Sequence, residues 1–264
     1  MATPRLVTAQ PCDALVSFVA PASLEADQYR GMRHLVEQLS RESNLRVFSV
    51  TSPSSGEGKT VTTLNLAGSL AQARHTRVLV IDADLHRPSV AEYLGMDRGQ
   101  SPGLIDLITR QDVSFEDVAG RIDALNLSVM STGQYESGAY ELLTSPRLDA
   151  IVDEARRQFD YVLIDTPPLM PLPDSRLIGR CVDAYFLVVA AHRTPRKALV
   201  EALNLIDRSK LIGTVFNGDD QPLRRYSAYY GYSQSVSGPR PGTPAWWRRS
   251  FKDRSRRRTA AVNR

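Results

Sequence analysis

The stretch Pro53-Ser-Ser-Gly-Glu-Gly-Lys-Thr60 decides the fold of this 264-residue chain. It follows the strand-like run 46–51 and precedes 61–73, where apolar residues recur at the spacing of one helix face. A strand, a glycine-rich turn and a helix in this order favour phosphate binding, because glycine lets backbone N–H groups point inward and the helix start adds partial positive charge. We therefore expect Lys59 to reach the β- and γ-phosphates of a nucleotide and the Thr60 hydroxyl to ligate Mg²⁺.

Acidic residues end two further apolar runs. Asp82-Ala-Asp84 follows 77–81, and Asp165-Thr-Pro-Pro168 follows 159–164. Ligands of open α/β sheets bind at the carboxyl ends of strands, and carboxylates at i and i+2 share one side of a strand, where they repel unless a cation is near. Asp165 is expected to hold a magnesium-bound water. Each motif alone has an ordinary alternative, a surface turn, but the three together predict an ATP·Mg²⁺ site.

Strands and helices alternate along the chain. The apolar patterns predict strands near 46–51, 77–82, 126–130, 160–165, 184–190 and 212–216, and helices near 24–42, 59–74, 88–94, 102–109, 145–157, 174–180 and 195–208. This order predicts an α/β fold with a doubly wound, mostly parallel sheet of the P-loop NTPase type. We expect an N-terminal extension over 1–23 with a short strand at 14–19, a P-loop domain over 24–217, and a flexible tail over 218–264.

Composition and charge narrow the class of protein. The chain is 42% hydrophobic and 23% charged, and we expect a soluble, cytoplasmic protein because no apolar run approaches the roughly 18 residues that span a bilayer and no leader is recognisable. The spacing of Cys12 and Cys181 indicates neither a disulfide nor a metal site. Residues 239–264 carry nine Lys/Arg and one Asp, which gives this segment a net charge of +8. Because the whole chain has a net charge of +4, the remainder has a net charge of −4.

The basic tail also contains Trp246 and Trp247. Aromatic rings beside cations suit the headgroup layer of an anionic membrane, so we expect 246–258 to contact such a surface. Nucleic acid, bound through counterion release, is a less favoured partner, and a solvated end is the other alternative.

The motifs resemble those of the bacterial tyrosine kinases (BY-kinases), which control capsule and exopolysaccharide export. The resemblance covers about residues 25–232 and rests on S-x-G-E-G-K-T at 54–60, on 78–88, on 161–168, on 171–175 and on a late tyrosine cluster. It implies ATP-dependent phosphorylation of protein tyrosine on a P-loop fold, with the phosphate-loop roles carried by Lys59 and Thr60.

The resemblance also assigns roles residue by residue. Asp84 and Asp165 organise Mg²⁺ with Thr60, and Asp82 accepts the tyrosine proton, which makes Lys59, Asp82 and Asp84 the expected catalytic residues. The residues expected to contact the nucleotide are Ser55, Gly56, Glu57, Gly58, Lys59, Thr60, Val61 and, at the adenine edge as in related P-loop ATPases, Asn217. An ordinary turn at 217–220 is the alternative for Asn217.

The expected phosphate acceptors are Tyr226, Tyr229, Tyr230 and Tyr232, which we expect to be phosphorylated by a neighbouring copy of the chain. A packed tyrosine-rich turn is the alternative. Assembly is implied by Asp27-Gln-Tyr-Arg30-Gly-Met-Arg33, which resembles the family pattern E-x-x-R-x-x-R with Asp in place of Glu; solvated helix charges are the alternative. The family further implies a transmembrane chain-length regulator as activating partner, and hence a location at the inner face of the cell membrane.

Two departures from family patterns keep other functions open. Pro53 replaces the first glycine of the usual phosphate loop, and His86 stands where the family has Arg. They favour, as one alternative, a weakly active scaffold that binds nucleotide within an export complex. The other alternative is a positioning or partition ATPase that binds DNA or membrane; such ATPases carry a second Lys early in the loop, where this chain has Ser54.

Overall fold

A computed structural model describes residues 5–73, 75–96, 102–134 and 137–219. All of them belong to the first of the two units into which the chain divides, Met1–Asp219 and Asp220–Arg264. The predicted tyrosine cluster and the basic, tryptophan-containing tail lie outside the described residues. The domain boundaries predicted at 23/24 and 217/218 stay predictions.

The described residues form a seven-stranded sheet in the order β3-β4-β2-β5-β1-β6-β7. The strands are β1 Val47–Thr51, β2 Val78–Asp82, β3 Ala119–Ile122, β4 Leu127–Met130, β5 Tyr161–Asp165, β6 Ala184–Ala190 and β7 Leu211–Asn217. All neighbouring strands are parallel except β3 and β4, which are antiparallel. The predicted mostly parallel α/β sheet is thus confirmed. The antiparallel β3, Ala-Gly-Arg-Ile, was missed because this stretch has no apolar run.

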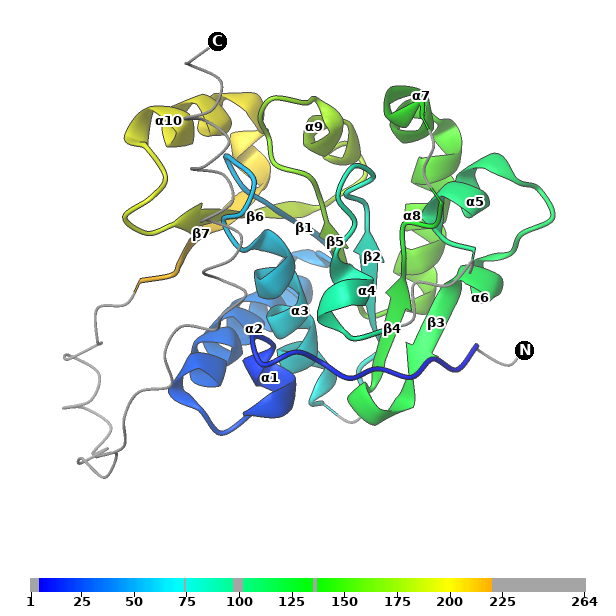
Figure 1. Cartoon of the computed structure of the whole chain (residues 1–264), viewed down its shortest axis with the longest axis horizontal. Coiled ribbons are helices and arrows are strands. Elements are labelled where there is room, and N and C mark those ends of the chain that lie inside the picture. The colour runs from blue at the N-terminus through cyan, green and yellow to red at the C-terminus, as the bar shows by residue number, and fades with distance from the viewer. Residues whose placement is uncertain (1–4, 74, 97–101, 135–136, 220–264) are drawn as a thin grey trace, which may run out of the picture. The chain divides into compact units, whose positions relative to one another are not determined.

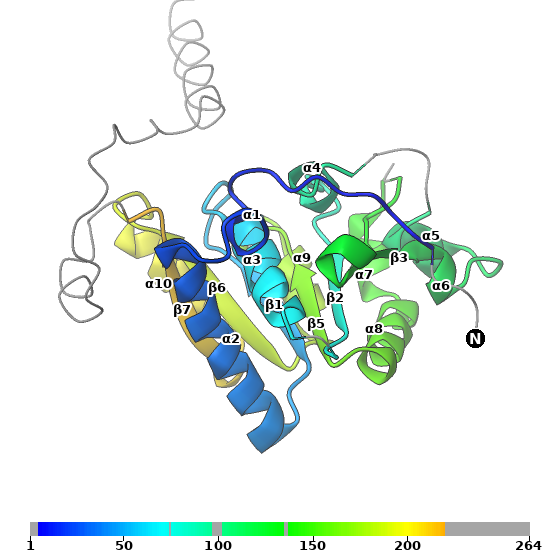
Figure 2. The same ribbon diagram turned by 90° about the horizontal axis from the view of Figure 1, so that it is seen from below.

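Helices cover both faces of the sheet (Figures 1 and 2). They are α1 Val16–Val19, α2 Leu24–Ser43, α3 Lys59–Ala71, α4 Val90–Tyr93, α5 Leu104–Thr109, α6 Phe115–Val118, α7 Ala139–Thr144, α8 Pro146–Gln158, α9 Asp174–Ile178 and α10 Arg196–Leu205, with 3-10 turns η1 Asp123–Leu125 and η2 Arg208–Lys210. The sequence patterns predicted the long helices within a few residues and missed the short α6 and α7.

Alternation along the strands separates two hydrophobic layers. In β2, Val78 and Val80 join the core under α2 and α3, whereas Leu79 and Ile81 join the core under α5 and α8. A third cluster lies under α10. Because consecutive side chains of a strand point to opposite faces, the continuous apolar runs of the sequence are explained by burial on both sides. This burial fixes the strand ends, where the polar residues lie.

The segment before α2 corrects one prediction: residues 16–19 form the helical turn α1 instead of a strand. Its backbone is held by α3, since Ser17 N donates to Asn65 Oδ1 at 2.9 Å and Asn65 Nδ2 donates to the Ala14 carbonyl at 2.9 Å. A short apolar run does not reveal its period, so the partner element decided the outcome.

Helix α2 follows this turn and begins at a clear capping signal. The Ser23 side chain accepts a hydrogen bond from Ala26 N at 3.2 Å, and Glu25 and Asp27 lie in the first turn, where negative charge is favourable. The helix packs on α3 through its buried side, which includes Val36. Within the described residues, no helix is long and apolar enough to cross a membrane.

Candidate nucleotide and phosphoryl-transfer site

The predicted phosphate loop connects the end of β1 to the start of α3. Gly56 and Gly58 have φ values of +81° and +95°, which side chains rarely adopt. Gly58 is the N-cap of α3 and offers no side chain to the helix start, so the first N–H groups of the helix are available to an anion. Ser55 and Gly56 are exposed at the apex of the loop, where a ligand has access to them.

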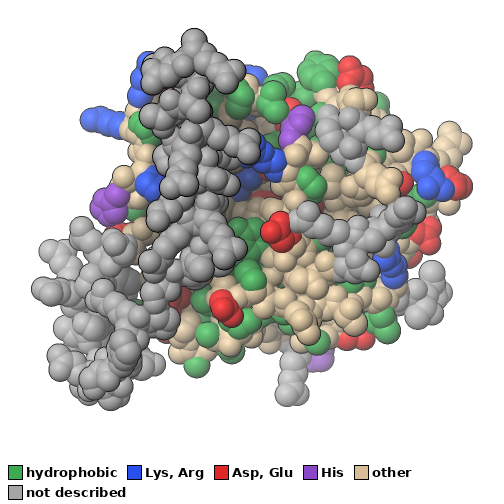
Figure 3. Space-filling view, in the orientation of Figure 1, with side chains coloured by type: hydrophobic (Ala, Val, Ile, Leu, Met, Phe, Trp, Pro, Cys, Tyr) green, Lys and Arg blue, Asp and Glu red, His purple; other side chains and the backbone are tan. Residues whose placement is uncertain are grey.

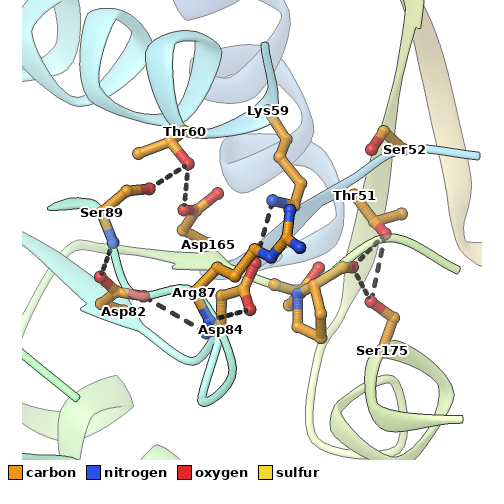
Figure 4. A network of polar contacts seen from close by, with 12 residues as sticks. Thr51, Ser52, Lys59, Thr60, Asp82, Asp84, Arg87, Ser89, Asp165 and Ser175 are labelled. Atoms are coloured by element: carbon orange, nitrogen blue, oxygen red, sulfur yellow. Dashed lines mark hydrogen bonds and ion pairs between the residues drawn. The ribbon is translucent and has the colours of Figure 1, made fainter. Parts of the chain in front are cut away.

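Behind the loop, the predicted charged residues meet in one cluster (Figure 4). Lys59 Nζ lies 3.1 Å from Asp84 Oδ2, and the Thr60 hydroxyl donates to Asp165 Oδ2 at 2.6 Å. Thr63, which the sequence did not single out, donates to the other oxygen of Asp165 at 3.2 Å. The order β2-β5-β1 places the ends of these strands side by side, and it therefore brings together residues from three distant motifs.

Asp82 has different partners from Asp84. Its carboxylate accepts from the backbone N–H groups of Ser89 and Val90 at 3.0 Å each, and from Asp84 N at 3.2 Å. Burial raises the pKa of Asp82 to about 7, and the Asp165 carboxylate adds to the rise. A carboxylate with a pKa near neutrality suits a general base, because the best proton acceptor has a pKa close to the operating pH.

The charges of the cluster leave an excess of negative charge. Burial also raises the pKa of Asp165 to about 6, against the opposing charge of Lys59. For Lys59, burial acts to lower the pKa, but the carboxylates of Asp165 and Asp84 outweigh it, so its pKa is raised and the ammonium stays charged. With Asp82, three carboxylates thus face one ammonium, a set that a divalent cation would balance.

The donor set fits Mg²⁺ bound together with a nucleotide. Among the described residues, no group of three or more His, Cys, Asp or Glu side chains is arranged as a metal cage. Magnesium usually takes one or two carboxylates and completes its shell with water and phosphate oxygens, so it does not need such a cage. The residues that would hold it are Thr60, Asp84 and Asp165; these roles stay predictions.

Asn217, at the end of β7, contacts the phosphate loop itself. Its Nδ2 donates to the Glu57 carbonyl at 2.9 Å, and a Cβ at Gly58 would lie 1.8 Å from the same nitrogen. Glu57 is 4% exposed, and its carboxylate accepts from the Thr194 hydroxyl at 2.9 Å. The loop is therefore held by the turn that follows β6 and by the end of β7. Sequence reasoning missed Thr194, for which no local motif exists, and the adenine contact of Asn217 stays a prediction.

The segment 171–175 supports the site from the other side. His86 Nε2 lies 2.9 Å from Asp174 Oδ2, which joins the turn after β2 to α9. The Ser175 hydroxyl contacts the Pro167 carbonyl and lies 3.2 Å from Thr51 Oγ1. These contacts join the ends of β1, β2 and β5 to α9, and they give the resemblance at 171–175 a structural role.

The residues predicted for assembly are bonded within the chain. Arg30 pairs with Asp27 and donates to the Pro21 carbonyl at 2.6 Å. Arg33 pairs with Glu37 at 2.6 Å and donates to the Ser69 carbonyl of α3 at 3.0 Å. A role between copies of the chain stays a prediction.

Comparison with known proteins places the chain in a family. A family model described as an AAA domain matches residues 45–189. Tyrosine-protein kinase YwqD of Bacillus subtilis (strain 168) is 30% identical over 219 residues, which cover 82% of this chain and 91% of that protein. The solved BceF tyrosine kinase domain is 31% identical with a TM-score of 0.69, covering 77% of this chain and 81% of that one.

A longer relative matches only in part. The succinoglycan biosynthesis transport protein ExoP of Rhizobium meliloti (strain 1021) is 28% identical over 218 residues, which are 80% of this chain but 27% of ExoP. Together with the phosphate loop and its carboxylates, these matches show that the chain belongs to the bacterial tyrosine kinases, built on an AAA domain. The predicted family and P-loop fold are confirmed, and nucleotide binding is the shared property of this fold.

Proposed function

We propose that this chain is an ATP-dependent protein-tyrosine autokinase that phosphorylates its C-terminal tyrosines in trans and thereby regulates polysaccharide polymerisation and export. The observation that carries the proposal is the buried Lys59–Asp84 pair beside Asp82 and Asp165 at the start of α3. The names of relatives support the reaction and the process: YwqD is a tyrosine-protein kinase and ExoP a succinoglycan biosynthesis transport protein.

The residues of the site divide the work of phosphoryl transfer. The N–H groups at the start of α3 and the Lys59 ammonium would bind phosphate oxygens, while Thr60, Asp84 and Asp165 would hold the metal. Bound Mg²⁺ supplies charge neutralisation on the phosphates. Asp82 takes the proton of the acceptor tyrosine, whose ordinary pKa is about 10 and which therefore needs a base as it attacks.

The acceptors are the four tyrosines 226, 229, 230 and 232. Counted from residue 218, an extended chain reaches about 30 Å by residue 226, at roughly 3.3–3.6 Å per residue, which is enough for a neighbour's site. Each phosphate adds up to about two negative charges. Because the chain outside residues 239–264 has a net charge of −4, phosphorylation weakens assembly by like-charge repulsion.

Assembly and location follow from the same scheme. Copies associate through the α2 residues Asp27, Arg30 and Arg33, a transmembrane chain-length regulator acts as activator, and the basic segment 246–258 holds the kinase at an anionic membrane surface. The partial match to ExoP, 27% of its length, supports a kinase that works beside a second polypeptide. Sedimentation with anionic and with neutral vesicles tests the membrane contact, and equal binding to both contradicts it.

Labelled ATP with Mg²⁺ tests the reaction. Label on tail tyrosine supports the kinase, release of free phosphate without it supports the positioning ATPase, and neither product supports the scaffold. For transfer between chains, a Lys59→Met chain that keeps its tyrosines is mixed with a catalytically intact chain in which the four tail tyrosines are Phe. We expect label on the Lys59→Met chain in the mixture and on neither chain alone; an unlabelled mixture contradicts phosphorylation in trans.

A further inference from the structure

Two adjacent basic side chains in the turn after β2 have different surroundings. His86 lies against Asp174 of α9, as described above. Arg87 donates its backbone N–H to Asp84 Oδ1 at 3.0 Å, and its side chain is exposed. Within the described part of the chain, the Arg87 guanidinium forms no hydrogen bond or ion pair. The turn thus presents one basic side chain that contacts α9 and one, the Arg87 guanidinium, without such a contact in the described part of the chain.

The Arg87 side chain extends from this turn toward Lys59 (Figure 4). A single carboxylate connects the two residues, since Asp84 accepts from Lys59 Nζ with Oδ2 and from Arg87 N with Oδ1. The space-filling view also shows Lys and Arg side chains gathered near the middle of the drawn face (Figure 3). The Asp84 carboxylate balances only part of this positive charge locally, and a further anion placed between the Lys59 ammonium and the Arg87 guanidinium would be attracted by both.

The reaction supplies such an anion. During phosphoryl transfer, negative charge is spread over the three equatorial oxygens of the moving group, and catalysis consists mainly of positioning and neutralising it. Lys59 already forms an ion pair with Asp84, and its ammonium is also attracted by the Asp165 carboxylate. A guanidinium is always charged and its planar fork matches phosphate oxygens in pairs, which makes it suited to this task.

We propose that Arg87 is a further catalytic residue, one that binds the terminal phosphate of the nucleotide and stabilises the phosphoryl group as it moves. In that step, the bond between the γ-phosphorus and the β–γ bridging oxygen breaks and ADP leaves. The tyrosine oxygen forms the new bond to phosphorus, and its proton passes to Asp82. The identity of the phosphate acceptor rests on the proposed function, whereas the contact between Arg87 and the terminal phosphate rests only on the nucleotide site.

The test compares nucleotides that differ by the terminal phosphate. In the full chain with Mg²⁺, affinities for fluorescent ADP and for a non-hydrolysable ATP analogue are measured for wild type, Arg87→Gln and Arg87→Lys. The matched control is Arg157→Gln, which also removes one exposed charge but lies in the last turn of α8. We expect Arg87→Gln to weaken the triphosphate about tenfold and ADP less than twofold, with the Lys variant in between and the control unchanged.

Rates give a second readout. Autophosphorylation of Arg87→Gln is expected to fall about 10²- to 10³-fold, as for loss of one preorganised charge-stabilising donor. Equal weakening of ADP and the triphosphate, or no change in either, overturns the proposal, because both outcomes leave the terminal phosphate without a contact to Arg87. If wild type fails to phosphorylate tyrosine, the proposed function fails, while the difference between the two affinities still decides the role of Arg87.

Discussion

Replacing Asp165 by Asn should make the ligand-free protein more stable while it damages the site. Asp165 is fully buried, and its two oxygens accept from the hydroxyls of Thr60 and Thr63. Asn has nearly the same shape, and both hydroxyls rotate to suit a neutral amide. Lys59 keeps its partner Asp84 at 3.1 Å, so the substitution does not strand a buried ammonium.

The magnitude follows from the pKa. Burial raises the pKa of Asp165 from 3.8 to about 6, so the fold favours the protonated form. A raised pKa contributes stability below the unfolded value, and this contribution is lost as the pH rises through about 6. At pH 8 the loss is about 3 kcal/mol, at about 1.4 kcal/mol per pKa unit. The hydrogen-bond rearrangement that the Asn amide requires costs about 1 kcal/mol of this gain. Asp165→Asn should therefore be about 2 kcal/mol more stable than wild type at pH 8, which corresponds to a Tm higher by about 4–8 °C.

Thermal unfolding followed by circular dichroism, in EDTA and without nucleotide, measures the effect at pH 8 and pH 5. The Tm of Asp165→Asn should exceed that of wild type at pH 8 and approach it at pH 5, where wild-type Asp165 is mostly protonated. The control is Asp183→Asn. Asp183 is also partly buried but pairs with Arg156 at 2.5 Å, and its pKa is lowered because the Arg156 hydrogen bond and those from Arg46 N and Val47 N outweigh burial. This variant should therefore lose stability at pH 8.

The reasoning is refuted if Asp165→Asn unfolds below wild type at pH 8. It is also refuted if the gain is the same size at pH 5 as at pH 8, because a pH-independent gain cannot come from removal of an ionised carboxylate. A control that gains stability as Asp165→Asn does would show that loss of any negative charge stabilises the fold.

Three further outcomes are expected. Gly58→Ala should lower ADP affinity at least about tenfold, because the added Cβ would lie 1.8 Å from Asn217 Nδ2. Adding Asn217→Gly should restore part of the lost affinity in the same titration, and no recovery would contradict the clash. Arg33→Gln should destabilise by about 1–2 kcal/mol even at protein concentrations too low for assembly, because it removes the bond from Arg33 of α2 to the Ser69 carbonyl of α3; a loss of stability seen only at high concentration would contradict a role for this bond within the chain. Thr194→Val should lower Tm more at pH 8 than at pH 5, because it removes a hydrogen bond to the buried Glu57 carboxylate. Burial raises the pKa of Glu57, so the charged form that needs this bond is more populated at pH 8. Equal shifts in Tm at the two pH values would contradict this.

The sequence by itself determined the parts of the protein that depend on neighbouring residues. The glycines and lysine of 53–60, the apolar runs and the acids at their ends lie within a few residues of one another, so their patterns predict a strand, a loop and a helix directly. The same patterns predicted the sheet type and the family. They failed for residues 16–19, which take their form from contacts with the distant helix α3, and for the short strand β3, whose stretch has no apolar run.

Only the tertiary structure decided how the site is built. Thr60 and Asp165 are 105 residues apart, and Thr194 and Asn217 contact Glu57 from 137 and 160 residues away. Such contacts depend on the strand order β2-β5-β1-β6-β7, which places the carboxyl ends of non-consecutive strands beside one loop. The different surroundings of His86 and Arg87 have the same cause, because α9 supplies the carboxylate that His86 contacts. Local pattern fixes which residues are available, and the packing of the sheet fixes which of them meet.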